Sequence, residues 1–258
     1  EGGYAGPAGA GFSDQRNPVQ YLRDNDLDNS HEYRTFGNAY AELDLFKNVT
    51  ARTEFGIDYT NYYLRDVNKR YSTGFMTSEV NSLTNEQSHT INWNWNNTLN
   101  YSFEFNQHSG NVLLGMEAIK HEWLNLSASR RQFATETPNY WYLNAGTGEA
   151  NNSGSGTGYQ LLSYFGKVNY IFADKYLMDA TLRYDGSSRF GENEQFGLFP
   201  AFSLGWRINN EPFLSDIDFI SQFKLRYGWG VTGNQEIANS ARFTMYSPDY
   251  NGTSYDLS

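Results

Sequence analysis

Aromatic and amide side chains that could bind a ligand lie close together in one polar stretch of the sequence. Tyr140, Trp141, Tyr142 and Asn144 stand between two segments of alternating apolar and polar residues. Aromatic rings stack on sugars and peptides while amide groups hydrogen-bond to them, so we predict that these four residues bind substrate on an external loop. Mobile surface loops are often rich in such residues without binding anything, and that alternative stays open.

The residues that could hold a metal ion lack the required pattern. Asp24, Asp26 and Asp28 have the spacing that begins a calcium loop, but Asn29 and Thr35 stand where such a loop needs glycine and glutamate. The four histidines are scattered and there is no cysteine, which argues against a zinc site. No phosphate-binding glycine loop, nucleophile elbow or Ser/His/Asp arrangement stands out. We therefore predict no metal, no cofactor and no enzymatic activity.

Composition favours aromatic β-strands over membrane helices. Aromatic residues make up 17% of the 258 residues, whereas the mean hydropathy is only −0.67. No window approaches the roughly 18 consecutive apolar residues of a membrane helix. A strand in a barrel wall shows lipid only every second residue, so these values fit a membrane barrel as well as a soluble protein. The net charge of −10, with no basic cluster longer than Arg130-Arg131, argues against nucleic-acid binding.

Strict two-residue alternation predicts eight strands in four pairs. The paired segments are 33–45 with 49–63, 90–103 with 112–118, 162–172 with 176–184, and 196–208 with 223–231. Lengths of about 12 to 16 residues exceed the usual 5 or 6 of soluble sheets and are enough to cross a bilayer.

The connections between these segments alternate between short and long. Short turns are expected at 47–48, 106–110 and 173–175, and long polar stretches at 65–87, 129–160 and 185–195. Bacterial outer-membrane barrels have short periplasmic turns and long extracellular loops, so we predict that orientation. The Gly/Ser/Asn tract 146–158 is then expected to be a flexible external loop.

The two faces of the predicted sheet differ in polarity. The polar set expected in an aqueous lumen is Arg52, Glu54, Asp58, Asn92 and Asn94, and the apolar set expected in lipid is Phe55, Ile57, Trp93 and Trp95. Strand length and the Trp and Tyr residues near strand ends favour this arrangement. A soluble sheet with the apolar face packed inside is the alternative.

An ordered series of motifs in the last third of the chain carries a family resemblance. The motifs are SYFG at 163–166, DKY at 174–176, DGSSRFG at 185–191, FP at 199–200, SLGWR at 203–207, KLR at 224–226 and VTGNQ at 231–235. In this order they resemble the SusC/RagA family of TonB-linked (TonB-dependent) outer-membrane transporters. The resemblance covers 161–236 closely, and it departs at 227–230, where the family more often has small residues and then Tyr before Gly.

The resemblance implies an all-β transmembrane antiparallel β-barrel of about 22 strands. About eight of them would lie in 1–258, one partial barrel domain, with the plug domain and the other strands outside this chain. It also implies import of bulky nutrients, oligosaccharides (glycan import) or peptides, across the bacterial outer membrane. The partners implied are TonB, contacted through segments outside this chain, a SusD-like lipoprotein lid and outer-membrane lipid. A passive porin or a small structural outer-membrane barrel remains the alternative.

The DGSSRFG motif is the most specific part of the resemblance and forms a family signature loop. Its residues are Asp185, Gly186, Ser187, Ser188, Arg189, Phe190 and Gly191. Gly, Ser and Asp favour a turn between two strands on the long-loop rim. We predict a structural role in which Asp185 and Arg189 make hydrogen bonds that order the loop. Direct contact with a lid protein or substrate is the alternative.

Overall fold

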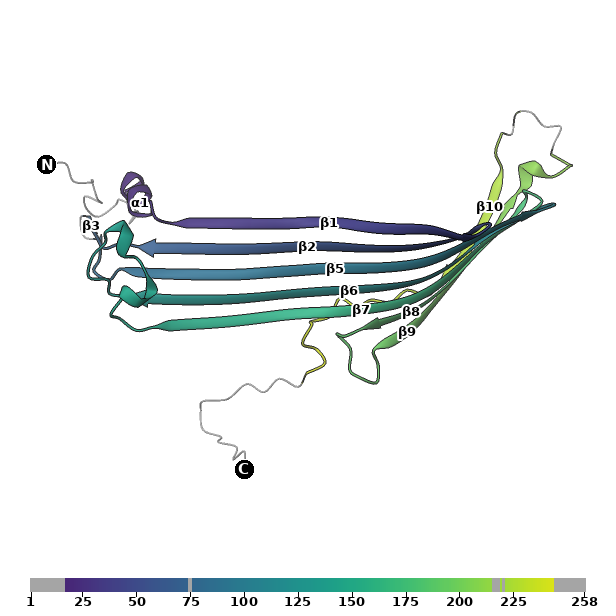
Figure 1. The fold of residues 1–258 in the computed structure, drawn as a ribbon. Coiled ribbons are helices and arrows are strands. Elements are labelled where there is room, and N and C mark those ends of the chain that lie inside the picture. Colours follow the sequence, from purple (N-terminus) through teal and green to yellow (C-terminus); the bar gives the residue numbers. More distant parts are fainter. Residues whose placement is uncertain (1–16, 74–75, 215–218, 220, 244–258) are drawn as a thin grey trace, which may run out of the picture. The chain divides into compact units, whose positions relative to one another are not determined.

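The computed structural model describes residues 17–243 except 74–75, 215–218 and 220. Eight strands form one sheet, in the order β1-β2-β5-β6-β7-β8-β9-β10 (Figure 1). They are β1 (Asn29–Phe46), β2 (Val49–Asn68), β5 (Ser82–Phe105), β6 (His108–Arg131), β7 (Asn151–Phe172), β8 (Tyr176–Ser187), β9 (Phe196–Arg207) and β10 (Lys224–Gly230). Within this sheet, each of the eight strands neighbours the next of the eight along the chain. The pairs from β7 to β10 are antiparallel. The prediction of an all-β antiparallel barrel segment is confirmed.

Short elements occupy the connections. A helix, α1 (Pro18–Asp24), precedes β1, and β3 (Tyr71–Thr73) pairs with β4 (Met76–Ser78) between β2 and β5. Three short 3-10 turns are η1 (Pro138–Tyr140), η2 (Leu143–Ala145) and η3 (Ile208–Asn210). Among the described residues, no helix has the length and apolar character needed to span a membrane.

Strand lengths differ from the prediction, because β5 and β6 have 24 residues each and β10 has 7. The Gly/Ser/Asn tract is a specific correction, because residues 151–158 belong to β7 and not to a flexible loop. A β-ladder is held by backbone groups, which small polar residues supply as well as apolar ones. Gly156 and Gly158 also let β7 approach β6, since a Cβ there would lie 2.4 Å from the Leu124 side chain and 2.7 Å from the His121 carbonyl.

The tight turns on one rim depend on left-handed backbone conformations. Asn48, Asn106, Ala173 and Asp174 have φ values between 50° and 66°. Asn and Asp accept this conformation at low cost, which explains why the polar dipeptides marked the turns correctly. The turn predicted at 106–110 is shorter than expected, because β6 already begins at His108.

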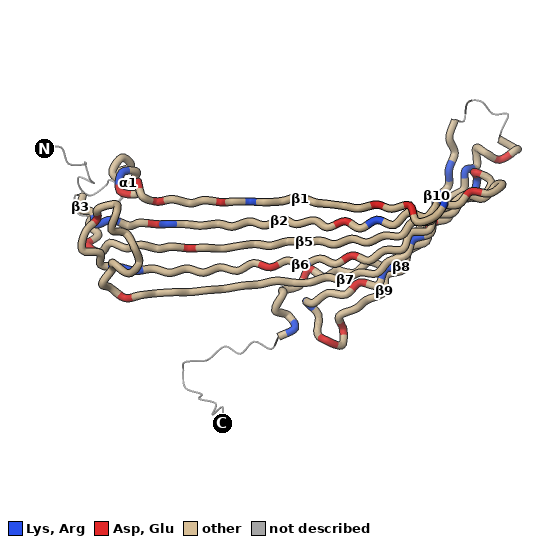
Figure 2. The backbone as a smooth tube through the Cα atoms, in the orientation of Figure 1, with Lys and Arg blue, Asp and Glu red and all other residues tan. Residues whose placement is uncertain are grey.

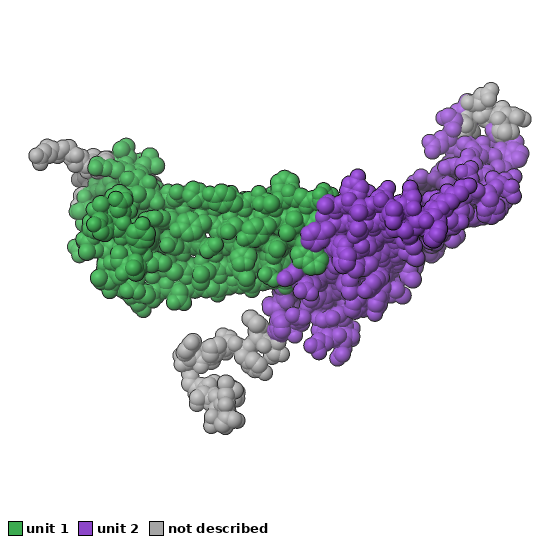
Figure 3. Space-filling model, viewed as in Figure 1, with its two compact units in different colours: residues 1–38, 56–93, 121–158 green, residues 39–55, 94–120, 159–258 purple. Residues whose placement is uncertain are grey.

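The described chain forms two compact units (Figure 3). Unit 1 comprises the described residues within 1–38, 56–93 and 121–158, and unit 2 comprises those within 39–55, 94–120 and 159–258. In unit 1, the buried hydrophobic side chains form one small cluster. Its members are Val67, Leu83, Phe133 and Trp141, with Leu27 and Leu143 packed against them.

The sheet has an exposed apolar face and a polar face with paired charges. On β8, Met178, Leu182 and Tyr184 are 41%, 51% and 46% exposed. The alternating residues Asp179 and Arg183 take part in hydrogen bonds and ion pairs. Figure 2 shows that acidic and basic residues recur along the strands. An apolar face exposed along a strand, with a polar face opposite, is typical of a barrel wall that faces lipid.

A carboxylate holds the short-turn rim of unit 2 together. Glu211, which follows η3 and is 8% exposed, accepts hydrogen bonds from Lys175 Nζ at 2.9 Å, Trp206 Nε1 at 3.0 Å and Tyr176 Oη at 2.8 Å. These bonds, the one from Lys175 most strongly, lower the pKa of Glu211 from 4.5 to about 2. Hydrogen bonds to the ionised form stabilise it, so the network favours the folded state while Glu211 is charged.

Acid is therefore expected to weaken this rim. Because the folded-state pKa is below the ordinary value, the contribution of Glu211 is complete above pH 4.5 and is lost as the pH falls toward 2. We expect Glu211→Gln to lower the urea midpoint of unfolding in lipid vesicles at pH 7, and the gap from wild type to close between pH 4.5 and pH 2. Glu192→Gln, at an exposed loop position, is the control and should show no such closing gap. A gap that persisted unchanged at pH 2 would contradict the prediction.

Candidate functional site

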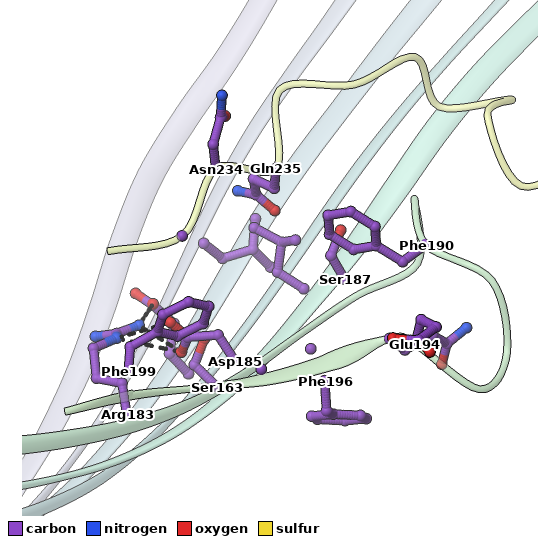
Figure 4. Close-up of a pocket in the computed structure, with 17 residues that line it drawn as sticks. Ser163, Arg183, Asp185, Ser187, Phe190, Glu194, Phe196, Phe199, Asn234 and Gln235 are labelled. Atoms are coloured by element: carbon purple, nitrogen blue, oxygen red, sulfur yellow. Dashed lines mark hydrogen bonds and ion pairs between the residues drawn. The ribbon is translucent and has the colours of Figure 1, made fainter. Parts of the chain in front are cut away.

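The family motifs converge on one cavity of unit 2, which we call the signature cavity. It has a volume of about 440 Å³, and its walls come from β6, β7, β8, β9, the loop between β8 and β9, and the segment after β10 (Figure 4). Four motifs that are separate in sequence contribute to it, at 163–166, 185–191, 199–200 and 231–235. Four of the seven motifs that carry the resemblance therefore share one site.

Two carboxylates share one guanidinium in the wall of this cavity. Arg183 Nε donates to the Asp185 carboxylate at 3.2 Å, and Arg183 Nη2 lies 3.6 Å from Glu117 Oε2. The same guanidinium carbon stands 5.1 Å from the centre of the Phe165 ring. These contacts hold Arg183 in place. The carboxylates of Asp185 and Glu117 carry two negative charges, and the Arg183 guanidinium supplies one positive charge.

A nearly buried serine also lines the cavity. Ser163 is 6% exposed and lies opposite Asp185 in the pairing of β7 with β8. Among the residues that the structure describes, none hydrogen-bonds to the Ser163 hydroxyl, and its oxygen is not one of the fully buried atoms without a partner. A hydroxyl both donates and accepts, so this group is available to a ligand in the cavity.

Glycines let the segment after β10 approach the wall closely. A Cβ at Gly233 would lie 2.5 Å from the Phe199 ring, and one at Gly197 would lie 2.8 Å from the same ring. Any larger residue at Gly233 would push the segment off Phe199. Asn234 and Gln235 follow directly and line the cavity opposite Arg183 and Asp185 (Figure 4).

Arg189 of the signature loop fastens this segment. The Arg189 guanidinium donates to Asn239 Oδ1 at 2.7 Å and to the Gln235 carbonyl at 2.8 Å, and it lies over the Tyr159 ring at 4.1 Å. Arg189 is only 9% exposed. Asp185 in turn accepts a hydrogen bond from Arg183, and the structural role of the signature loop stays a prediction. Phe190, the next residue of the loop, lines the cavity.

The four aromatic and amide candidates of the external loop have different environments. Tyr140 and Tyr142 are 59% and 64% exposed and Asn144 is also exposed, whereas Trp141 is 1% exposed. The Trp141 ring packs on Phe133 with centroids 4.7 Å apart. Tyr140, Tyr142 and Asn144 therefore remain candidates for contact with substrate, and Trp141 packs inside the loop.

Sequence analysis did not identify Asn81, whose side chain hydrogen-bonds to the backbone of this loop. Asn81, 1% exposed, donates to the Phe133 carbonyl at 3.1 Å and accepts from the Phe133 amide at 2.8 Å. Partial burial would raise the pKa of Glu136, but hydrogen bonds from Arg70 and Asn81 outweigh burial and lower it. No motif distinguishes Asn81 from the many other Asn residues of the chain, so only the fold brings it into view.

Comparison with known proteins agrees with this geometry. No family model matches the chain. TonB-dependent receptor P39 of Formosa agariphila is 31% identical over 245 residues, which cover 90% of this chain and 23% of that receptor. TonB-dependent receptor SusC of Bacteroides thetaiotaomicron is 49% identical over 79 residues, which cover 31% of this chain and 8% of SusC.

Solved structures show the same fold. The RagAB peptide transporter superposes with a TM-score of 0.76 at 22% identity, over 86% of this chain and 24% of that chain. The RagAB peptide importer in the open-open state gives a TM-score of 0.77 at 24% identity, with the same coverage. The chain thus spans less than a quarter of the length of these relatives.

These matches define the class first: the chain is part of the β-barrel wall of a TonB-dependent outer-membrane receptor. More narrowly, it is a barrel segment of the SusC/RagA type, as the motif series indicated. The relatives are receptors and transporters by name and not enzymes.

Proposed function

We propose that the full-length protein imports bulky nutrients, oligosaccharides or peptides, across the outer membrane with energy supplied through TonB. In this proposal a SusD-like surface lipoprotein covers the extracellular rim, and the plug and the TonB-contacting segment lie outside the 258 residues. TonB-dependent receptors are relatives by sequence, and one solved relative is described as a peptide importer.

The observation that carries the proposal is the polar face of the barrel wall. Ion pairs recur along it, such as Arg34 with Asp58 at 2.6 Å and Arg52 with Glu54 at 2.8 Å. Charged side chains in contact with water keep most of their hydration. In a dry interior each charge would carry a large desolvation cost, so this face is expected to be wet. A wet lumen lined with hydrogen-bonding groups suits passage of a large polar solute.

Energy dependence distinguishes active import from the passive porin. Cells lacking the gene and complemented with the full-length protein are supplied with a fluorescently labelled nutrient mixture of glycans and peptides. We expect uptake to exceed that of uncomplemented cells and to fall at least tenfold when a protonophore collapses the proton-motive force. Uptake that the protonophore leaves unchanged would indicate a passive pore, and uptake equal to that of uncomplemented cells would exclude both functions.

A further inference from the structure

The signature cavity has the acceptors for a small cation but contains no free cation of its own. Glu117, Asp185 and Glu194 line it, and the one basic side chain in the wall is Arg183. Arg183 is held by Asp185 at 3.2 Å, by Glu117 at 3.6 Å and by the Phe165 ring at 5.1 Å. The cavity therefore has an excess of negative charge that its own arginine does not neutralise.

A second observation concerns Ser163, which is 6% exposed and lines the cavity. No hydrogen bond ties its hydroxyl to another described residue, and its position on β7 is paired with Asp185 on β8. An ammonium group has three N–H donors and no acceptor. The hydroxyl of Ser163 and the carboxylates of Asp185 and Glu117 are three acceptors of the matching kind on one wall.

The remaining wall suits the apolar stem of such a ligand. The Phe190 and Phe199 rings line the cavity, and the Phe199 ring lies against the Cα of Gly233. An aromatic face attracts a cation and also packs against methylene groups. The volume of about 440 Å³ is within the range of small-ligand sites, but it is too small for a long oligosaccharide.

We propose that the signature cavity is a subsite for a primary ammonium group of a peptide cargo, a lysine side chain in particular, bound by Ser163, Asp185 and Glu117. This inference rests on the proposed import function and narrows its cargo to peptides that carry an amine. The signature loop then has two roles, since Arg189 fastens the wall segment at Gln235 while Asp185 binds the ligand.

The test measures binding to the purified full-length protein in detergent by isothermal titration calorimetry. The probes are acetyl-Ala-Lys-Ala-amide, the same peptide with norleucine in place of lysine, and maltotriose. We expect the lysine peptide to bind at least tenfold more tightly than the norleucine peptide, because a charge-assisted hydrogen bond stabilises it. Glu117→Gln and Asp185→Asn should each reduce this preference to about threefold or less.

Glu54→Gln is the matched control, because Glu54 is also a carboxylate paired with one arginine, Arg52, but does not line the cavity. It should keep the full preference. If Asp185→Asn does not fold, Glu117→Gln decides, since the contact of Glu117 with Arg183 at 3.6 Å is long. Equal binding of the two peptides, a preference unchanged in Glu117→Gln, or binding of maltotriose alone would overturn the inference. Protonophore-sensitive uptake would leave the import function standing in each of these cases.

Discussion

A lysine at Leu99 is expected to destabilise the folded barrel by about 2–4 kcal/mol. Leu99 is 39% exposed on the apolar face of β5. Leu99 lies between the middle of β5 and the short turn at Asn106. Because a strand crosses the bilayer in about 9–11 residues, this places Leu99 near the midplane of the membrane. A charge at this position faces hydrocarbon without a partner. The measurement is the free energy of unfolding in urea, with the full-length protein in lipid vesicles.

Thr98→Lys is the matched control for this prediction. Thr98 is adjacent to Leu99 on β5, so the two residues lie at nearly the same depth but point to opposite faces. A lysine on the wet face should change the free energy of unfolding by about 1 kcal/mol or less. Equal losses for the two variants would contradict the assignment of the apolar face to lipid.

The sequence was sufficient for the strands that carry alternation but not for their ends. Each of the eight predicted segments lies on one strand and passes beyond its ends by at most one residue, because lipid on one face and water on the other impose a period of two. Residues 151–158 were assigned to a loop because Gly, Ser and Asn give no hydrophobic alternation. Beyond the lipid both faces are wet, so the ladder continues there without a sequence signal.

The site was only partly predictable for a similar reason. The motifs at 163–166, 185–191 and 231–235 were found individually, since each has a distinctive residue series. That they surround one cavity depends on the pairing of β7 with β8 and on the return of the chain after β10. Glu117 lies in no motif, and its place in the cavity wall depends on the position of β6 next to β7 in the sheet.

Trp141→Ala is expected to destabilise the loop 132–150 of unit 1 by about 3–5 kcal/mol. Trp141 is 1% exposed, packs on Phe133 at 4.7 Å, donates from Nε1 to the Glu136 carbonyl at 3.3 Å, and accepts from Arg65 at its own carbonyl at 3.0 Å. Truncation removes the largest ring of a small buried cluster and leaves an empty space in its place. The expected result is rapid proteolysis within 132–150 of the full-length protein, under conditions in which the wild type resists cleavage.

Tyr142→Ala separates packing from recognition in the same loop. Tyr142 is 64% exposed, so its loss should change the stability of the loop by about 0.5 kcal/mol or less and leave protease resistance intact. If Tyr142 contacts substrate, Tyr142→Ala weakens binding while the loop stays folded, whereas Trp141→Ala weakens binding only by unfolding the loop. Protease resistance equal to wild type in Trp141→Ala would show that the buried ring does not hold this loop. Binding measurements on the two variants would then decide whether Trp141 or Tyr142 contacts substrate.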